Sequence, residues 1–345
     1  MSPPLTTLQA RLVRAFARGG RALLVCAAAG LWGCAALPPE GVSSASPAAV
    51  EPAVGGAFHA RLLPAATGLT LTALQRPARA VPARYRVIVI PGSGCAGMAL
   101  FADRYFAGLL HAEVLVLHKP WVDADASTPT DKCSVAFVQA DALGAWRDHA
   151  LAALRADAQE QAQTRAHASP LPQLLVGISE GAELLPALAA EVPHLAGLVL
   201  LSSSGLDPRE ALALQAEQQG ALPALRVLER AQASALPDAA VREGRSLRYW
   251  RDLWLWPSAR PLLAAPWPLL QVWGEADAQI APGAYQRFSA LARQRAAPYC
   301  ARRLPGADHG LQRAGHDGVQ QLWGWLEQWA RAPAAGLCAG VAITD

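Results

Sequence analysis

The chain has 345 residues, of which 52% are hydrophobic and only 17% are charged. This composition supports one large core and excludes a mainly disordered protein. The formal net charge is +3, but the first 33 residues hold four arginines and no acid, and the remaining 26 basic and 27 acidic residues almost cancel. A chain balanced in this way has no strongly basic surface, so we expect no nucleic-acid partner.

The first 33 residues are predicted to be a signal peptide. The arginines at 11, 14, 18 and 21 form a positive region, and the apolar stretch 22–31 that follows is too short to span a bilayer stably. The stretch ends in Leu-Trp-Gly-Cys34, which resembles a bacterial lipobox and makes Cys34 the expected lipidation site. The alternative is an ordinary cleaved signal that ends near Ala29 or Ala36. Either case predicts export, and a lipid anchor would hold the protein in the bacterial envelope, facing the periplasm.

Residues 34–57 are rich in Pro, Ala, Ser and Gly and are predicted to be a flexible tether. The folded domain is expected over 58–345. No internal repeat is visible in it.

Strand-like and helix-like segments alternate along this domain. The segment 58–75 is expected to supply one or two antiparallel edge strands. Short apolar or β-branched runs predict further strands at 86–91, 113–117, 173–177, 195–201, 267–273 and, more weakly, 301–304. Helices are expected over 135–163, 182–191 and 318–330, with Pro186 able to kink or shorten the second one.

This alternation predicts an α/β fold: a mostly parallel central sheet with helices on both faces. About sixty residues, 207–266, interrupt the pattern without a convincing strand. They are predicted to be a helical cap inserted above the carboxyl ends of the strands, where such sheets bind ligands.

A serine lies between two glycines directly after the strand predicted at 173–177. The sequence Gly177-Ile-Ser179-Glu-Gly181 is a G-x-S-x-G motif at a strand-to-helix turn. Glycines are needed where the turn is sharp and crowded, and the serine Oγ must stand clear of the backbone to act as a nucleophile. The motif resembles the nucleophile elbow of α/β-hydrolases, which implies that fold and a serine hydrolase activity.

The resemblance implies an acid and a histidine in the order Ser, acid, His. Asp277 follows the fifth predicted strand of the series in Trp-Gly-Glu-Ala-Asp, and His309 follows the next in Gly-Ala-Asp-His-Gly. Since each follows a strand, all three side chains are expected at one edge of the sheet, with His309 as the base and Asp277 as its orienting acid. Glu275 is the alternative acid and Asp308 a weaker one.

Backbone N–H groups must stabilise the oxyanion of such a reaction. In this family one donor is the N–H after the nucleophile, here that of Glu180. The second is expected from the glycine-rich stretch 91–97, with Ser93 matching the family's position best and Gly94 or Cys95 as alternatives. The stretch fits neither a P-loop nor a dinucleotide-binding fingerprint.

A narrower resemblance is to bacterial carboxylesterases with a Gly-x-Ser-Glu-Gly elbow. It covers roughly residues 86–329 and depends on short segments around positions 92–94, 179–181, 274–280 and 308–312, although Pro91 stands where that family has a histidine. It implies hydrolysis of a small-molecule carboxylic ester through an acyl-enzyme, without a metal or organic cofactor. The alternatives are a thioesterase or peptidase of the same fold, and a catalytically inactive hydrolase fold used for binding.

Trp250 and Trp254 lie four residues apart, on one face of a predicted cap helix. They are expected either to line an apolar acyl pocket or to pack the cap onto the core.

Four cysteines follow the leader and Cys34. An even number in an exported protein predicts two disulfides, and the absence of C-x-x-C gives no support for a zinc site. Cys95 and Cys133 each follow one of two adjacent strands at the same edge, whereas Cys300 begins the last strand and Cys338 lies beyond the antiparallel last helix. This topology predicts the pairs Cys95–Cys133 and Cys300–Cys338.

Overall fold

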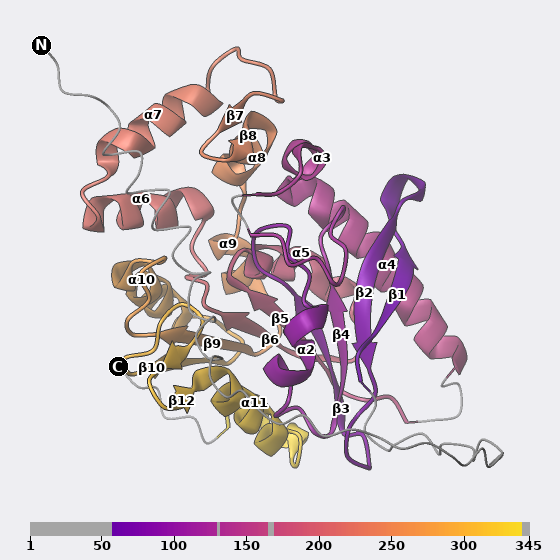
Figure 1. The fold of residues 1–345 in the computed structure, drawn as a ribbon. Helices are drawn as coiled ribbons and strands as arrows, with labels where there is room; N and C mark the ends of the chain where they lie inside the picture. The colour runs from indigo at the N-terminus through magenta and orange to yellow at the C-terminus, as the bar shows by residue number, and fades with distance from the viewer. Residues whose placement is uncertain (1–56, 130–131, 165–168, 340–345) are drawn as a thin grey trace, which may run out of the picture.

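The computed structural model describes residues 57–129, 132–164 and 169–339 (Figure 1). The predicted signal peptide, Cys34 and almost all of the predicted tether lie outside the described residues. In the part of the chain that the structure describes, no helix is both long and apolar enough to cross a membrane.

The centre of the fold is an eight-stranded sheet with the order β1-β2-β4-β3-β5-β6-β9-β10. The strands are β1 (His59–Pro64), β2 (Thr70–Arg76), β3 (Tyr85–Ile90), β4 (Ala112–Leu117), β5 (Gln173–Ile178), β6 (Leu195–Leu201), β9 (Leu269–Gly274) and β10 (Tyr299–Leu304). The first two pair antiparallel at one edge, and the strands from β4 to β10 pair parallel. Each predicted strand is therefore present, including the antiparallel edge.

The middle strands form because they are covered on both faces. All six residues of β3 are buried, as are five of the six in β5. Val87 and Val89 point into one apolar core and Ile88 and Ile90 into the other, as the alternation of side chains along a strand requires. The register sets Ile90 beside Gly177, so the loops after β3 and β5 leave the sheet side by side.

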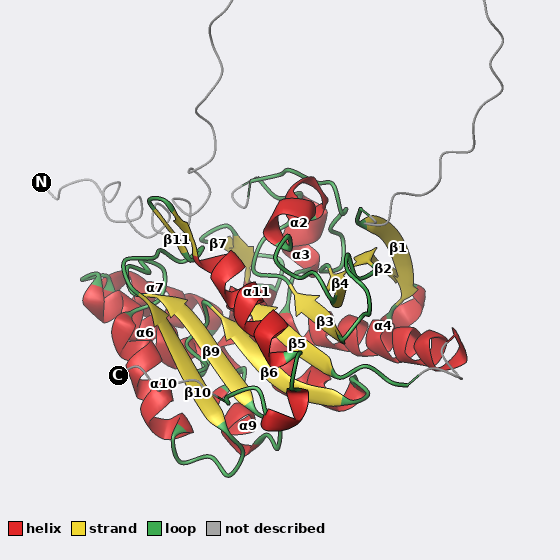
Figure 2. Cartoon of the chain, turned by 90° about the horizontal axis from the view of Figure 1, so that it is seen from below, coloured by secondary structure: helices red, strands yellow, loops and turns green. Residues whose placement is uncertain are grey.

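Helices cover both faces. One core is closed by α2 (Ala99–Tyr105) and α11 (Gly318–Trp329), and the other by α4 (Leu143–Thr164), α5 (Leu185–Leu188) and α10 (Pro282–Ala292). Figure 2 shows α11 crossing the near face of the sheet while α4 and α10 lie behind it. Buried aromatic residues, Phe106 and Trp323 with ring centroids 5.6 Å apart, join α2 to α11.

Two predicted helices differ from the structure. The segment 135–163 is not continuous: α3 (Val135–Ala140) ends at Asp141, whose backbone is extended, and α4 begins at Leu143. The segment after Ser179 is a run of short pieces, namely the 3₁₀ turn η3 (Ser179–Leu184), α5 and the 3₁₀ turn η4 (Ala189–Glu191). Pro186 stands in the first turn of α5, where its missing N–H does no harm, so it helps to start this helix.

The connection between β6 and β9 is largely helical, as predicted. It contains α6 (Pro208–Gln218), α7 (Leu222–Gln232), α8 (Leu247–Leu255) and α9 (Ala259–Ala264). It also holds a small hairpin that the sequence did not predict, formed by β7 (Val241–Arg242) and β8 (Arg245–Ser246), two residues each and joined at Gly244, whose φ is +73°. We call residues 207–266 the insertion.

Candidate active site

Ser179 stands on a strained turn directly after β5. Its φ is +50°, which is unusual for a residue other than glycine. The flanking glycines explain how the turn closes: a Cβ at Gly177 would lie 2.3 Å from Cα of Ala182, and one at Gly181 only 2.2 Å from the carbonyl oxygen of Ile90. Neither position accepts a side chain, so backbone packing requires the two glycines of the motif here.

His309 and Asp277 lie next to Ser179. The Nε2 atom of His309 is 3.1 Å from Oγ of Ser179, and its Nδ1 atom is 2.8 Å from Oδ2 of Asp277. The three residues follow β5, β9 and β10, and their side chains meet at one edge of the sheet. The loops after β9 and β10 pack closely because Gly274 has no side chain; a Cβ there would lie 2.2 Å from the carbonyl oxygens of Ala307 and Asp308.

The Asp277 carboxylate is buried and fully hydrogen bonded. Oδ1 accepts from the N–H groups of Gln279 and Ile280 at 2.7 and 3.1 Å, and Oδ2 also accepts from the Tyr285 hydroxyl at 2.7 Å. Burial alone would raise the pKa of Asp277, but the bonds from His309, Tyr285 and the backbone outweigh it, and the pKa lies below its usual value. The ionised Asp277 accepts a hydrogen bond from Nδ1–H of His309, which keeps the proton on Nδ1 and leaves Nε2 free to accept from Ser179.

The alternative acids are occupied elsewhere. The exposed carboxylate of Glu275 accepts from the N–H of Gly306 at 3.1 Å and lies 3.6 Å from Arg303. Asp308 accepts from the N–H of Gln312 at 2.8 Å. Of the three candidate acids, Asp277 is therefore the one that contacts the histidine.

Two supporting residues were missed by sequence reasoning. Tyr285 on α10 stacks on Trp273 with centroids 5.0 Å apart and aims its hydroxyl at Asp277. Ser202, at the end of β6 with φ of +51°, donates to the carbonyl oxygen of His309 at 2.6 Å. Tyr285 follows Asp277 by eight residues, a spacing with no sequence signature, and Ser202 could have been suspected only from its place after a central strand.

The loop predicted to supply an oxyanion donor lies beside Ser179. A Cβ at Gly92 would be 3.5 Å from Cβ of Ser179, and the next residue, Ser93, is exposed.

The loop ends at Met98, whose N–H donates to Nε2 of His118 at 3.0 Å, while Nδ1 of His118 lies 3.1 Å from the carbonyl oxygen of Thr72. Burial lowers the pKa of His118 although the Thr72 bond opposes this. A neutral His118 with its proton on Nδ1 satisfies both contacts, and so fixes the end of the loop.

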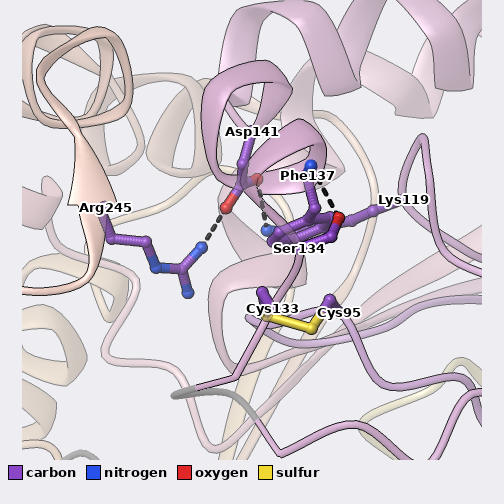
Figure 3. Close-up of a disulfide and its surroundings, with 7 residues drawn as sticks. All are labelled: Cys95, Lys119, Cys133, Ser134, Phe137, Asp141 and Arg245. Carbon is purple, nitrogen blue, oxygen red and sulfur yellow. Dashed lines mark hydrogen bonds and ion pairs between the residues drawn. A yellow bond between two sulfur atoms is a disulfide. The ribbon is translucent and has the colours of Figure 1, made fainter. Parts of the chain in front are cut away.

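Both predicted disulfides are present. Cys95 and Cys133 are joined with Cα atoms 5.7 Å apart, and Cys300 and Cys338 with Cα atoms 5.5 Å apart. Figure 3 shows the first bridge beside Ser134, whose Oγ accepts from the N–H of Phe137 at 3.1 Å and caps α3. The bridge therefore ties the loop after β3 to the start of α3.

The two tryptophans of the insertion have different surroundings. Trp250 is buried in the core, contacts Tyr249 edge to face at 5.1 Å, and donates from Nε1 to the carbonyl oxygen of Arg242. These are packing contacts. Trp254 lies under the Arg209 guanidinium and lines a cavity of about 370 Å³ together with Asp207, Glu210 and Trp256. A role for either residue in substrate binding stays a prediction.

Glu183, on the turn after Ser179, joins the insertion to the elbow. Its carboxylate accepts from the Ser258 hydroxyl, and its carbonyl oxygen accepts from Nε1 of Trp256 at 2.9 Å. Burial, together with the charges of Glu180 and Asp207, raises the pKa of Glu183 to about 8, although the Ser258 bond opposes the shift. Glu183 is thus largely protonated at neutral pH.

No cluster of three or more metal-binding side chains is found within residues 57–129, 132–164 and 169–339.

Comparison with known proteins identifies the fold. No family model matches the sequence, and no curated protein matches it. Among solved structures, a puromycin-hydrolysing peptidase from Mycobacterium tuberculosis is similar with a TM-score of 0.54 at 15% identity, over 84% of this chain and 42% of that chain. A puromycin hydrolase mutant complexed with PGG gives a TM-score of 0.56 at 13% identity, over 86% and 42%. Est1E from Butyrivibrio proteoclasticus gives 0.50 at 14% identity, over 80% and 99%.

The chain has the α/β-hydrolase fold. It spans less than half the length of the two puromycin hydrolases and about the full length of Est1E. At these identities the likeness extends to the fold alone.

The raised pKa of Glu183 predicts a pH-dependent stability. The folded state holds the Glu183 proton up to about pH 8, whereas the unfolded chain loses it near its ordinary value of 4.5. Stability from this group is therefore present below about pH 4.5 and is lost as the pH rises to about 8. We expect Glu183→Gln, which imitates the protonated carboxyl, to lose less thermal stability than the native chain between pH 5 and pH 9. Glu217→Gln, on an exposed position of α6, is the matched control, and an unchanged pH slope in Glu183→Gln would contradict the assignment.

Proposed function

We propose that this protein is an exported serine hydrolase that cleaves a carboxylic ester through an acyl-enzyme. The observation that supports this best is the hydrogen-bonded chain from Oγ of Ser179 through His309 to the ionised Asp277, with Ser179 raised on a strained turn. Ser179 is the proposed nucleophile, His309 the general base and Asp277 the residue that orients and charges the histidine.

In the proposed reaction, Nε2 of His309 takes the Ser179 proton as Oγ attacks the ester carbonyl. The N–H groups of Glu180 and Ser93 stabilise the resulting oxyanion. The tetrahedral intermediate then expels the alcohol, which takes the proton from the His309 imidazolium, and leaves an acyl-Ser179 ester. Water, activated by the same histidine, releases the acid and regenerates the serine. The proposed steps use side chains and backbone N–H groups of this chain, the ester substrate and one water molecule.

Two other activities of the same fold are the second candidates. The structures with a similar fold include a puromycin-hydrolysing peptidase as well as Est1E. The same three residues could also cleave an amide or a thioester. The Gly-x-Ser-Glu-Gly elbow favours the ester. A pure binding role has no need of a serine, a histidine and an acid held at hydrogen-bonding distance, so the geometry favours an enzyme.

Export and a lipid anchor belong to the same proposal. The two disulfides support export, because they persist in oxidising compartments. The anchor at Cys34, and with it a place in the bacterial envelope facing the periplasm, depends on the resemblance of the leader to a lipobox.

The nucleophile is tested with Ser179→Ala. We expect this variant to lose turnover of p-nitrophenyl acetate and covalent labelling by a fluorophosphonate, because among the described residues only the Ser179 hydroxyl is hydrogen bonded to Nε2 of His309. The fold should be retained, since among the described residues Oγ of Ser179 is hydrogen bonded only to His309. Ser127→Ala, at an exposed loop serine, is the control. Full labelling of Ser179→Ala would sink the assignment.

The acid is tested by comparing Asp277→Asn with Glu275→Gln. The asparagine keeps the shape but favours the wrong histidine tautomer, so kcat is expected to fall about 10²–10⁴-fold. Glu275→Gln should leave kcat nearly unchanged because its carboxylate contacts Gly306 and Arg303. Steady-state kinetics of the two variants decide which residue is the acid. A larger loss of kcat in Glu275→Gln than in Asp277→Asn would show that the acid is wrongly assigned.

The anchor is tested by metabolic labelling with a palmitate analogue in a bacterial host. We expect the full chain to take up the label and Cys34→Ala to lose it, whereas Cys26→Ala, within the leader, should keep it. Export of an unlabelled, soluble native chain would instead support an ordinary signal peptide cleaved near Ala29 or Ala36.

A further inference from the structure

Five polar side chains form a buried network between the proposed nucleophile and the insertion. Lys119 follows β4, Asp141 lies between α3 and α4, Glu180 is next to Ser179, and Arg245 and Tyr249 belong to the insertion. Lys119 Nζ is 3.0 Å from Oδ1 of Asp141 and also pairs with Oε1 of Glu180. The Tyr249 hydroxyl donates to Oε2 of Glu180 at 2.7 Å, and Arg245 pairs with Oδ2 of Asp141. Figure 3 shows Asp141 between Lys119 and Arg245.

Most of the network is buried, although the Arg245 side chain is 16% exposed. The side chains of Lys119, Asp141 and Glu180 are only 2%, 3% and 9% exposed. The Lys119 ammonium also lies over the Trp146 ring, 4.4 Å from its centroid. Two cations face two anions, so the cluster is neutral as a whole, which is the condition under which buried charges are tolerated.

Glu180 is held from two sides. Its carboxylate accepts one bond from Lys119, in the loop after β4, and one from Tyr249, in the insertion. Burial would raise the pKa of Glu180, but the charges of Lys119 and Arg245 and the two hydrogen bonds lower it below its usual value. The side chain is therefore an anion at neutral pH and keeps both bonds.

The position of this side chain matters because of the peptide it belongs to. Glu180 directly follows Ser179, and its N–H is the proposed oxyanion donor. Pinning both carboxylate oxygens of Glu180 limits rotation of the Ser179–Glu180 peptide, and small displacements of a donor of this kind cost large factors in rate.

We propose that Lys119 and Tyr249 are positioning residues for both acylation and deacylation: they orient Glu180 and with it the oxyanion N–H that serves both steps, and they couple the insertion to the nucleophile. This inference rests on the function proposed above. It assigns the two residues no contact with the substrate, so they should affect kcat and leave KM nearly unchanged.

The disulfide extends the same support to the second proposed donor. Cys133 lies immediately before the Ser134 cap of α3, and Asp141 follows the last residue of that helix. Cys95 is two residues from Ser93 in the loop after β3. Helix α3 is thus the shared support of both proposed oxyanion donors, reaching Ser93 through the disulfide and Glu180 through Asp141 and Lys119.

The test compares Tyr249→Phe with Tyr299→Phe. Each change removes one partly or fully buried tyrosine hydroxyl. That of Tyr299 bonds to Gln271 and Ser289, and among the described residues neither of these is hydrogen bonded to Glu180 or His309. Because Lys119→Met alone leaves an uncompensated charge and could fail to fold, the lysine is tested as Lys119→Met combined with Glu180→Gln, which preserves neutrality. Active sites are counted by exhaustive fluorophosphonate labelling, and kcat and KM for p-nitrophenyl acetate are expressed per labelled site.

We expect kcat per labelled site to fall about 10-fold in Tyr249→Phe and in the double variant, with KM within about twofold of the native value. Tyr299→Phe should match the native protein. A lower labelled fraction or melting temperature with native kcat per site would show a purely structural role and overturn the inference, as would a rise in KM alone or an equal loss in Tyr299→Phe. If the native protein neither reacts with the fluorophosphonate nor hydrolyses p-nitrophenyl acetate, the proposed function fails, and this inference fails with it. If the native protein is active and both variants have the native kcat per labelled site, the inference alone is overturned.

Discussion

The closed turn around Ser179 is the constraint on which the site depends. The chain must leave β5, reverse over the end of β3 and start η3 within a few residues, and a Cβ at either flanking glycine would collide with backbone. The positive φ of Ser179 stores strain that the surrounding packing has to maintain. Everything else near the serine either holds this turn or approaches it from a neighbouring strand.

The parallel sheet brings the partners to that turn. Strands β3, β5, β6, β9 and β10 run in the same direction, so the loops that follow them meet at one edge of the sheet. Each loop contributes one part of the candidate site. In the order of the strands, these parts are the glycine-rich loop, Ser179, Ser202, Asp277 and His309. The loops are then fixed to each other by backbone contacts. Ser202 bonds the His309 carbonyl, and Gly274 lets the acid loop lie against the histidine loop. The position of the His309 side chain thus depends on the three loops after β6, β9 and β10 together, and no single loop would fix it.

The elements with a local signal were predictable from sequence. Short apolar or β-branched runs predicted the strands. The placement of Ser179, Asp277 and His309 after three of these strands predicted that their side chains meet at one edge of the sheet. The topology of adjacent strands predicted both cysteine pairs. The break at Asp141 was not predictable, because the segment around it is a good helix former and the break is set by tertiary ion pairs to Lys119 and Arg245. The buried network of Lys119, Asp141, Glu180 and Arg245 was not predictable either, because these charges come from four separate segments and share no spacing in the sequence. Tyr285 was missed because a tyrosine in an amphipathic helix is usually a core residue, and here it is both core and hydrogen-bond donor.

The two buried carboxylates beside the proposed nucleophile are kept ionised by different means. Asp277 is stabilised by hydrogen bonds from two backbone N–H groups, a tyrosine and the histidine, so its environment is polar but contains no permanent cation. Glu180 is stabilised mainly by the fixed charges of Lys119 and Arg245. This difference suits their places in the proposed reaction. A permanent cation beside Asp277 would weaken its hold on the imidazolium that forms during catalysis, whereas Glu180 needs a rigid partner and no change of charge. The arrangement leaves Asp277 free to respond to the proton on His309 and leaves Glu180 fixed, which is what a donor peptide next to the nucleophile requires.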